Sequence, residues 1–129
     1  EIDNRPISRW GCDGLICSTP TGSTAYAFSA GGPILWPEVD ALVVLPISAH
    51  ALFSRPLVIS PTSKIVVGIE SAQALLSADA LRKFPLIAKD KVFVTKNDGI
   101  IKLAHLKNTS FSDRLVAKFK LPVEGWRGE

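Results

Sequence analysis

The sequence has no methionine, only two cysteines among its 129 residues, and no long uninterrupted apolar run. A membrane-spanning helix needs about 20 apolar residues, so the longest candidate, residues 41–47, is too short to cross a bilayer. Two cysteines are too few for a disulfide-stabilised scaffold. Since the sequence begins with neither an initiator methionine nor a signal peptide, we expect the chain to start within a longer protein.

The remaining composition fits one packed domain. Hydrophobic residues make up 47% and charged residues 21% of the chain, which excludes a disordered or fibrous protein. The net charge of +3 is uneven, because residues 64–129 carry twelve basic and seven acidic groups. Their lysines are scattered singly, which favours a solvated surface. We therefore expect neither nucleic acid nor a membrane as a partner.

The few cysteines and histidines do not form a metal-binding pattern. Cys12 and Cys17 lack the paired ligands of a zinc site. His50 and His105 lie far from them in sequence and beside apolar residues, so we expect packed or surface histidines. No protein metal site is predicted, and two free thiols fit a reducing cytoplasm.

The hydrophobic pattern predicts a mainly β fold. The later apolar runs are short and closely spaced, and turn residues separate them, which favours a sandwich or barrel over βαβ repeats. Residues 97–99 read Asn-Asp-Gly and predict a hairpin. The strands are expected at residues 15–17, 41–47, 56–60, 64–70, 84–88, 91–96 and 100–106.

A short helix is expected at residues 25–30. Ser23 or Thr24 could cap its start, and the Gly-Gly-Pro at residues 31–33 would end it. The preceding hydroxyl-rich loop (residues 18–24) has hydroxyl side chains at five of its seven positions.

A second helix is expected near the end of the sequence. Phe111, Leu115 and Phe119 recur every four residues, which predicts an amphipathic helix of about ten residues. Ser110 or Ser112 could cap it, and Pro122 would end it. Its apolar stripe must pack on this sheet or on another domain.

The hydroxyl-rich loop is the segment best suited to bind a ligand. Free N–H groups at a helix start favour an anion or a polar sugar, and Gly22 would let a ligand approach the backbone. Tyr26 offers a ring for stacking, and Asp13 can accept hydrogen bonds from ribose hydroxyls. These features suit a nucleotide, although a polar turn beside a capped helix explains the spacing equally well. The phosphate-loop, dinucleotide-fold and serine-hydrolase motifs are absent.

Three blocks of the sequence resemble one enzyme family. The run GCDGLICSTPTGSTAYAFSAGGPILWP at residues 11–37 closely resembles the signature of NAD kinases, which phosphorylate NAD to NADP. PISAHALFSRPLVIS at residues 46–60 is similar to the family's next block. FSDRLVAKFKLPVEGWRG at residues 111–128 is similar to the end of actinobacterial-type members. The resemblance covers essentially the whole chain.

The resemblance implies a domain organisation. Residues 1–108 would form the β-sandwich of an NAD kinase C-terminal domain, and residues 109–129 a tail helix that packs toward an N-terminal α/β domain. The family's catalytic Asp lies in a Gly-Gly-Asp-Gly motif, and an Asn-Glu pair holds the NAD adenosine. Neither motif occurs here, so the resemblance implies no catalytic residue in this chain and an inactive isolated fragment.

The resemblance also implies which residues bind NAD. Gly22 and Ser23 would shape the loop, while His50 and Arg55 match family positions whose role is not implied. Relatives carry a polar residue after an Asp-Gly or Asp-Ser pair, whereas this sequence reads Asp-Ala-Leu at residues 79–81. The NAD-binding set is Asp13, Thr21, Gly22, Ser23, Thr24, Ala25, Tyr26 and Ser29.

The activity implied for the full-length protein is transfer of a phosphoryl group from ATP or polyphosphate to the adenosine 2′-hydroxyl of NAD. Mg²⁺ would arrive with ATP, and the enzyme would be a cytoplasmic homodimer or homotetramer. One alternative is a lipid kinase of the diacylglycerol or sphingosine type, whose related domain lacks the STPTGSTAY run. The other is a non-enzymatic nucleotide-binding or assembly module.

Overall fold

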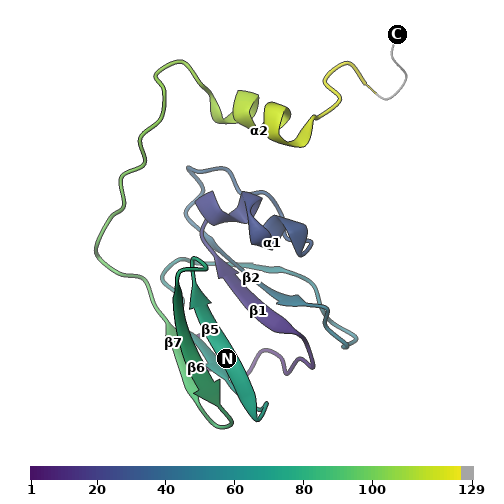
Figure 1. The fold of residues 1–129 in the computed structure, drawn as a ribbon, viewed down its shortest axis with the longest axis vertical. Coiled ribbons are helices and arrows are strands. Elements are labelled where there is room, and N and C mark those ends of the chain that lie inside the picture. The colour runs from purple at the N-terminus through teal and green to yellow at the C-terminus, as the bar shows by residue number, and fades with distance from the viewer. Residues whose placement is uncertain (126–129) are drawn as a thin grey trace.

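The protein is mainly β, as the sequence predicts. The computed structural model describes residues 1–125. Within them, short strands alternate with turns, and the few helices lie toward one end of the molecule (Figure 1). The elements are β1 (Gly14–Ser18), the 3₁₀ turn η1 (Thr21–Thr24), α1 (Tyr26–Ser29), β2 (Leu42–Ile47), β3 (Leu57–Ile59), β4 (Ile65–Gly68), β5 (Gln73–Ala78), β6 (Arg82–Ile87), β7 (Lys91–Val94) and α2 (Phe111–Phe119).

The three-stranded sheet β1-β2-β3 contains the core. Its strands are antiparallel, with Ile16 opposite Leu45 and Val43 opposite Val58. The central strand β2 is buried on both faces: Val43 and Leu45 pack with Ala27 of α1, and Val44 on the other face is 3% exposed. A strand buried on both faces consists of consecutive apolar residues. This continuous run is the reason that the sequence predicts β2.

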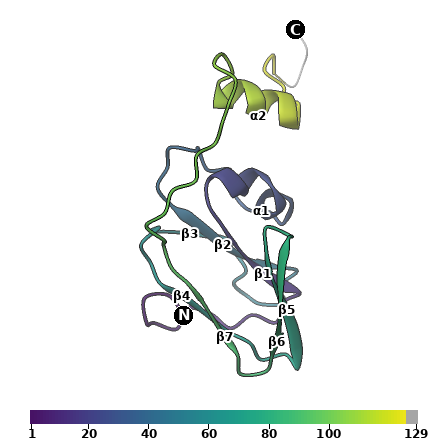
Figure 2. The ribbon, with the colours of Figure 1, turned by 60° about the vertical axis from the view of Figure 1, so that its left-hand side comes forward.

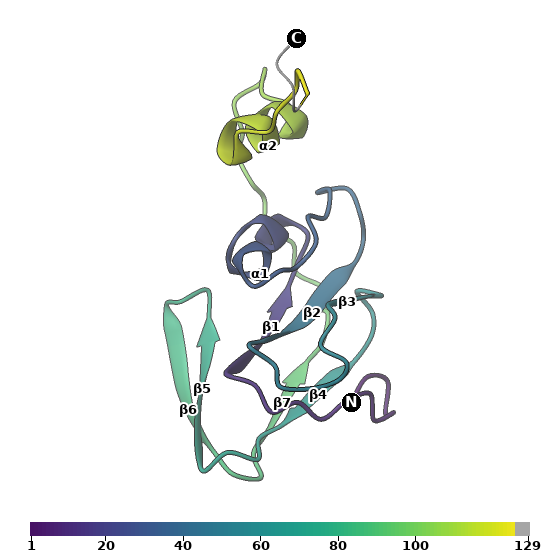
Figure 3. The ribbon, with the colours of Figure 1, turned by 90° about the vertical axis from the view of Figure 1, so that its right-hand side faces the viewer.

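The remaining strands form two separate antiparallel pairs, β4 with β7 and β5 with β6. Both pairs lie at the end of the molecule opposite α2, beside the three-stranded sheet (Figures 2 and 3). The structure thus has three small sheets, and the expected β-sandwich stays a prediction.

One predicted strand and the hairpin predicted before it are wrong. Residues 100–106 form no strand, and the expected hairpin at residues 97–99 is replaced by a turn in which the Gly99 N–H donates to Asn97 Oδ1 at 3.4 Å. β7 pairs with β4 instead, and residues 100–106 leave its open edge unpaired and run toward α2 (Figure 1). A strand forms only where it pairs, whatever its own β-propensity.

The sequence analysis missed β5. Its residues read Gln-Ala-Leu-Leu-Ser-Ala, without the branched and aromatic side chains typical of strands. Pairing with β6 holds it extended, and Leu76 lies opposite Phe84 in the register. Tertiary pairing therefore overrides a weak local preference in this hairpin.

The capping prediction is wrong for α1 and confirmed for α2. α1 begins after Ala25 with no side-chain cap, so the predicted caps Ser23 and Thr24 are wrong. α2 spans Phe111–Phe119, and Ser110 Oγ accepts the Asp113 N–H at 3.0 Å, which confirms one of the two caps proposed for it. The helix ends in a left-handed residue two positions before Pro122.

Candidate functional site

The hydroxyl-rich loop leaves the end of β1 and becomes the η1–α1 segment. Several of its hydroxyl groups form hydrogen bonds with backbone groups of the same loop. Ser18 Oγ donates to the Thr19 carbonyl at 3.0 Å, and the Gly22 N–H donates to Thr19 Oγ1 at 3.3 Å. β1 anchors the loop because it pairs with the buried strand β2 along its whole length. The segment at residues 21–29 therefore stands on a rigid support.

Ser23 is the internal anchor of this segment. Its side chain is 0% exposed, and Oγ donates to the Pro20 carbonyl at 2.6 Å. The same Oγ accepts the N–H of Leu35 at 2.9 Å. These bonds join η1 to the chain that follows α1. Ser23 thus shapes the loop, and its hydroxyl group does not face solvent.

Gly22 lies where two parts of the loop approach each other closely. A Cβ atom at this position would lie 2.7 Å from Ser18 Oγ. Real Cβ atoms essentially never make so short a contact. The glycine therefore serves the packing of the loop on Ser18, a reason that the sequence analysis did not give.

The exposed residues of the segment form its accessible surface. Tyr26 is 63% exposed, and Thr21, Ala25 and Ser29 are also exposed. Thr24 is half-buried. An exposed aromatic ring among hydroxyl groups can stack on a planar group while the hydroxyls bind polar atoms.

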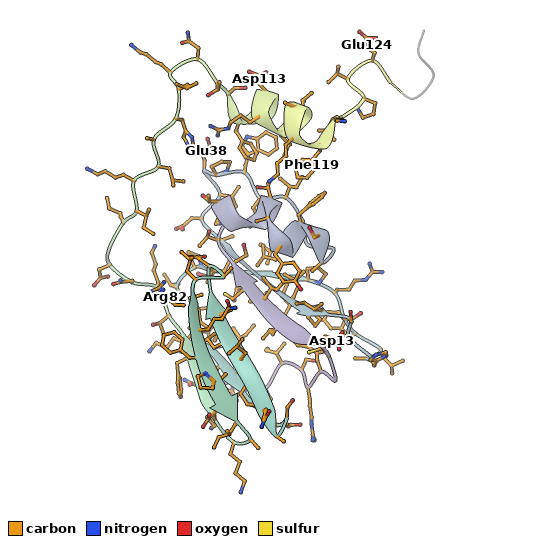
Figure 4. All side chains as sticks on the ribbon, in the orientation of Figure 1. Asp13, Glu38, Arg82, Asp113, Phe119 and Glu124 are labelled. Carbon is orange, nitrogen blue, oxygen red and sulfur yellow. The ribbon has the colours of Figure 1, made fainter. Side chains whose placement is uncertain are left out.

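Asp13 lies apart from the segment at residues 21–29. It immediately precedes β1, and its N–H donates to the Ile47 carbonyl at 2.9 Å. The five residues of β1, roughly 17 Å at the usual rise per residue, lie between Asp13 and Thr19. Asp13 is therefore at the far end of β1 (Figure 4). The structure brings residues 21–29 together and leaves Asp13 at a distance that only an elongated ligand would bridge.

A cavity of about 590 Å³ adjoins the C-terminal end of α1. β2 and the loop that precedes β3 form its other walls, and Arg55 contributes the one charged side chain. His50 lies nearby in sequence, and its N–H donates to the Gly11 carbonyl at 2.8 Å. The lining residues are Ala30, Gly31, Leu45, Pro46, Leu52, Phe53, Ser54, Arg55 and Pro56.

α2 also contacts the site. Lys118 Nζ donates to the Thr24 carbonyl at 2.6 Å. The ring of Phe119 lies against Phe28, and that of Phe111 against Trp36. Sequence reasoning missed these contacts, because no local signal connects residues so distant along the chain.

Other chemistry is sparse in the described part of the chain. Partial burial raises the pKa of the Cys17 thiol in β1, which favours its neutral form. Residues 1–125 contain no group of three or more His, Cys, Asp or Glu side chains that could hold a metal ion. None of their helices has the length and apolar character that a membrane crossing requires.

Comparisons with known proteins point to one family. The family model of the ATP-NAD kinase C-terminal domain matches residues 1–106. The chain is 54% identical to NAD kinase of Thermobifida fusca, covering 99% of this chain and 40% of that protein. It is 55% identical to NAD kinase 2 of Streptomyces avermitilis, covering 99% of this chain and 43% of that protein. The chain therefore spans about two fifths of the length of these relatives.

Solved structures agree. Yeast NADH kinase complexed with NADH has a TM-score of 0.68 and 39% identity to this chain. The match covers 71% of this chain and 27% of the yeast chain. An NAD kinase from Archaeoglobus fulgidus in complex with ATP has a TM-score of 0.61 and 33% identity to this chain. The match covers 76% of this chain and 41% of that one. On the sequence blocks, the mainly β fold and these matches, the chain belongs to the ATP-NAD kinase C-terminal domain family.

Proposed function

We propose that this chain is the NAD-binding part of an NAD kinase, which transfers a phosphoryl group from ATP or polyphosphate to the 2′-hydroxyl of the NAD adenosine. The observation that carries the proposal is the exposed segment at residues 21–29, supported on β1 and rich in hydroxyl groups. The relatives reported above are named NAD kinase, and one neighbour was solved with NADH and another with ATP. These names do not support the lipid-kinase alternative.

The residues divide into two roles in this proposal. The exposed or half-exposed members of the segment contact NAD directly, whereas Gly22 and Ser23 hold the loop in shape. Asp13 makes a separate contact along the length of β1. The contacting residues are Thr21, Thr24, Ala25, Tyr26 and Ser29.

Catalysis would depend on parts outside this chain. Phosphoryl transfer requires an oriented acceptor, a base and neutralisation of phosphate charge. This domain orients the acceptor NAD, and an N-terminal α/β domain supplies the base. Mg²⁺ would come with ATP, bound to its phosphate oxygens. We further propose that residues 109–129 are a tail to the β domain, and that the enzyme is a cytoplasmic homodimer or homotetramer.

Steady-state kinetics of the full-length enzyme test the assignment. Tyr26→Ala and Thr24→Val should raise the KM for NAD while the melting temperature stays near that of the parent enzyme. Ser71→Ala, an exposed serine just before β5, is the matched control. A large drop in melting temperature with unchanged NAD kinetics would make the loop purely structural. Calorimetric titration with NAD, ATP and diacylglycerol separates the kinase assignment from the two alternatives.

A further inference from the structure

α2 lies over α1 and the hydroxyl-rich loop in every view (Figures 1 and 3). The Phe119 and Phe28 ring centroids are 4.3 Å apart, and those of Phe111 and Trp36 are 4.8 Å apart with an edge-on geometry. These two aromatic pairs hold both ends of α2 against the chain around α1. The tail helix thus packs on the proposed NAD-binding segment by its predicted apolar stripe.

Between the aromatic pairs, Lys118 reaches the backbone of the loop. Its Nζ donates to the carbonyl of Thr24 at 2.6 Å, a hydrogen bond strengthened by the positive charge of the donor. Thr24 ends η1, and the dihedral angles of Ala25, φ −104° and ψ −128°, break the helical path before α1 begins. The bond therefore meets the backbone where its direction changes.

The peptide group between Thr24 and Ala25 is held at both of its polar ends. Lys118 binds its carbonyl oxygen, and the N–H of Ala25 donates to the Gly22 carbonyl at 3.0 Å. A peptide group is planar, so fixing both ends fixes the plane. The orientation of this plane determines where Ala25 and Tyr26 present themselves to a ligand.

We propose that Lys118 is a positioning residue for NAD binding, which acts through the Thr24–Ala25 peptide and makes α2 part of the NAD site. The inference rests on the proposed function. Lys118 would not touch the reacting atoms. It would lower the cost of ordering residues 24–26 around NAD, because the loop is held in its binding conformation before the ligand arrives.

The test compares Lys118→Met, Lys118→Arg and Lys107→Met in the full-length enzyme. Methionine keeps a long flexible side chain without the charge, arginine restores a charged donor, and Lys107 is an exposed lysine ahead of α2. We expect Lys118→Met to raise the KM for NAD about three- to tenfold, because solvent reduces the contribution of an exposed charged hydrogen bond. The KM for ATP should stay unchanged, Lys118→Arg should recover most of the loss, and Lys107→Met should match the parent enzyme.

Hydrogen exchange provides a second readout that does not depend on activity. Lys118→Met should speed exchange in residues 21–30 and leave β2 unchanged, with a melting temperature within about 2 °C of the parent. An unchanged KM for NAD, or equal losses for both substrates together with a lower melting temperature, would overturn the proposal. If the parent enzyme forms no NADP, the proposed function fails, and unchanged exchange in Lys118→Met would then overturn the positioning role separately.

Discussion

At the scale of single residues, the β5–β6 turn contains two left-handed residues. Asp79 has φ 51° and Ala80 has φ 59°, and the Leu81 N–H closes the turn on the Ala78 carbonyl at 3.2 Å. Aspartate tolerates this conformation, but the Cβ of alanine crowds the backbone in it. Ala80 stands where the resemblance implies Gly or Ser, and glycine would adopt its φ angle without strain.

Ala80→Gly should stabilise the protein. Removing the Cβ relieves left-handed strain of roughly 1–2 kcal/mol, and the greater freedom of glycine in the unfolded chain offsets part of this gain. We expect a net increase of about 0.5–1 kcal/mol in the free energy of unfolding, measured by urea denaturation. Ala74→Gly, within β5, is the control and should lower stability by about the same amount. A loss of stability in Ala80→Gly would show that this turn carries no strain.

Gly22 and Ser18 should show coupled effects. In Gly22→Ala the new Cβ displaces Ser18 Oγ, which must give up its 3.0 Å bond to the Thr19 carbonyl. We expect a loss of about 1–2 kcal/mol in the free energy of unfolding. In the double variant with Ser18→Ala there is room for the methyl group, so the combined loss should be smaller than the sum of the two single losses. Additive losses in denaturant titrations would contradict the close approach.

At the scale of elements, the predictable parts are those with local causes. α2 is evident from the four-residue spacing of its apolar residues and from Ser110, because the stripe lies within the helix and the cap directly precedes it. β2 is evident because a strand buried on both faces is a continuous apolar run. The hydroxyl-rich loop is likewise visible, since its composition is unusual over seven consecutive positions.

The parts that could not be predicted depend on distant partners. The hydroxyl of Ser23 binds Leu35 and so cannot cap α1, although its position before a helix suggests a cap. Residues 100–106 have strand-forming residues, but they pair with none of the neighbouring strands. The contact of Lys118 with Thr24 joins residues that 94 positions separate. In each case tertiary structure decides between options that the local sequence leaves open.

Ser110→Ala tests how the cap supports α2. Its hydroxyl accepts the Asp113 N–H and donates to Asp113 Oδ2 at 2.7 Å. Losing such a cap costs about 1 kcal/mol, so hydrogen exchange of residues 111–119 should speed up about fivefold. Ser112→Ala, an exposed change in the first turn, should have little effect. Equal exchange in both variants would mean that the aromatic contacts alone hold the helix.

At the scale of the whole molecule, many large apolar side chains face solvent. Leu75 and Ile87 are 59% and 62% exposed, and both lie on the same face of the β5–β6 hairpin. Phe93 on β7 is 68% exposed. Large exposed apolar patches often mark surfaces that other protein covers. We expect part of this exposed apolar surface to be covered in the assembly proposed above.

The 129-residue chain studied alone should therefore self-associate, and Leu75→Lys should reduce this association. The substitution places a charge on the apolar face of the β5–β6 hairpin without removing a core residue. Ser77→Lys adds the same charge to the same face, but removes no apolar side chain and should have the smaller effect. Light scattering over a concentration series measures the mean mass, and near-ultraviolet circular dichroism confirms that each variant stays folded. A parent chain that is monomeric throughout would contradict the expectation, because its exposed apolar face would then be stable in water without a partner.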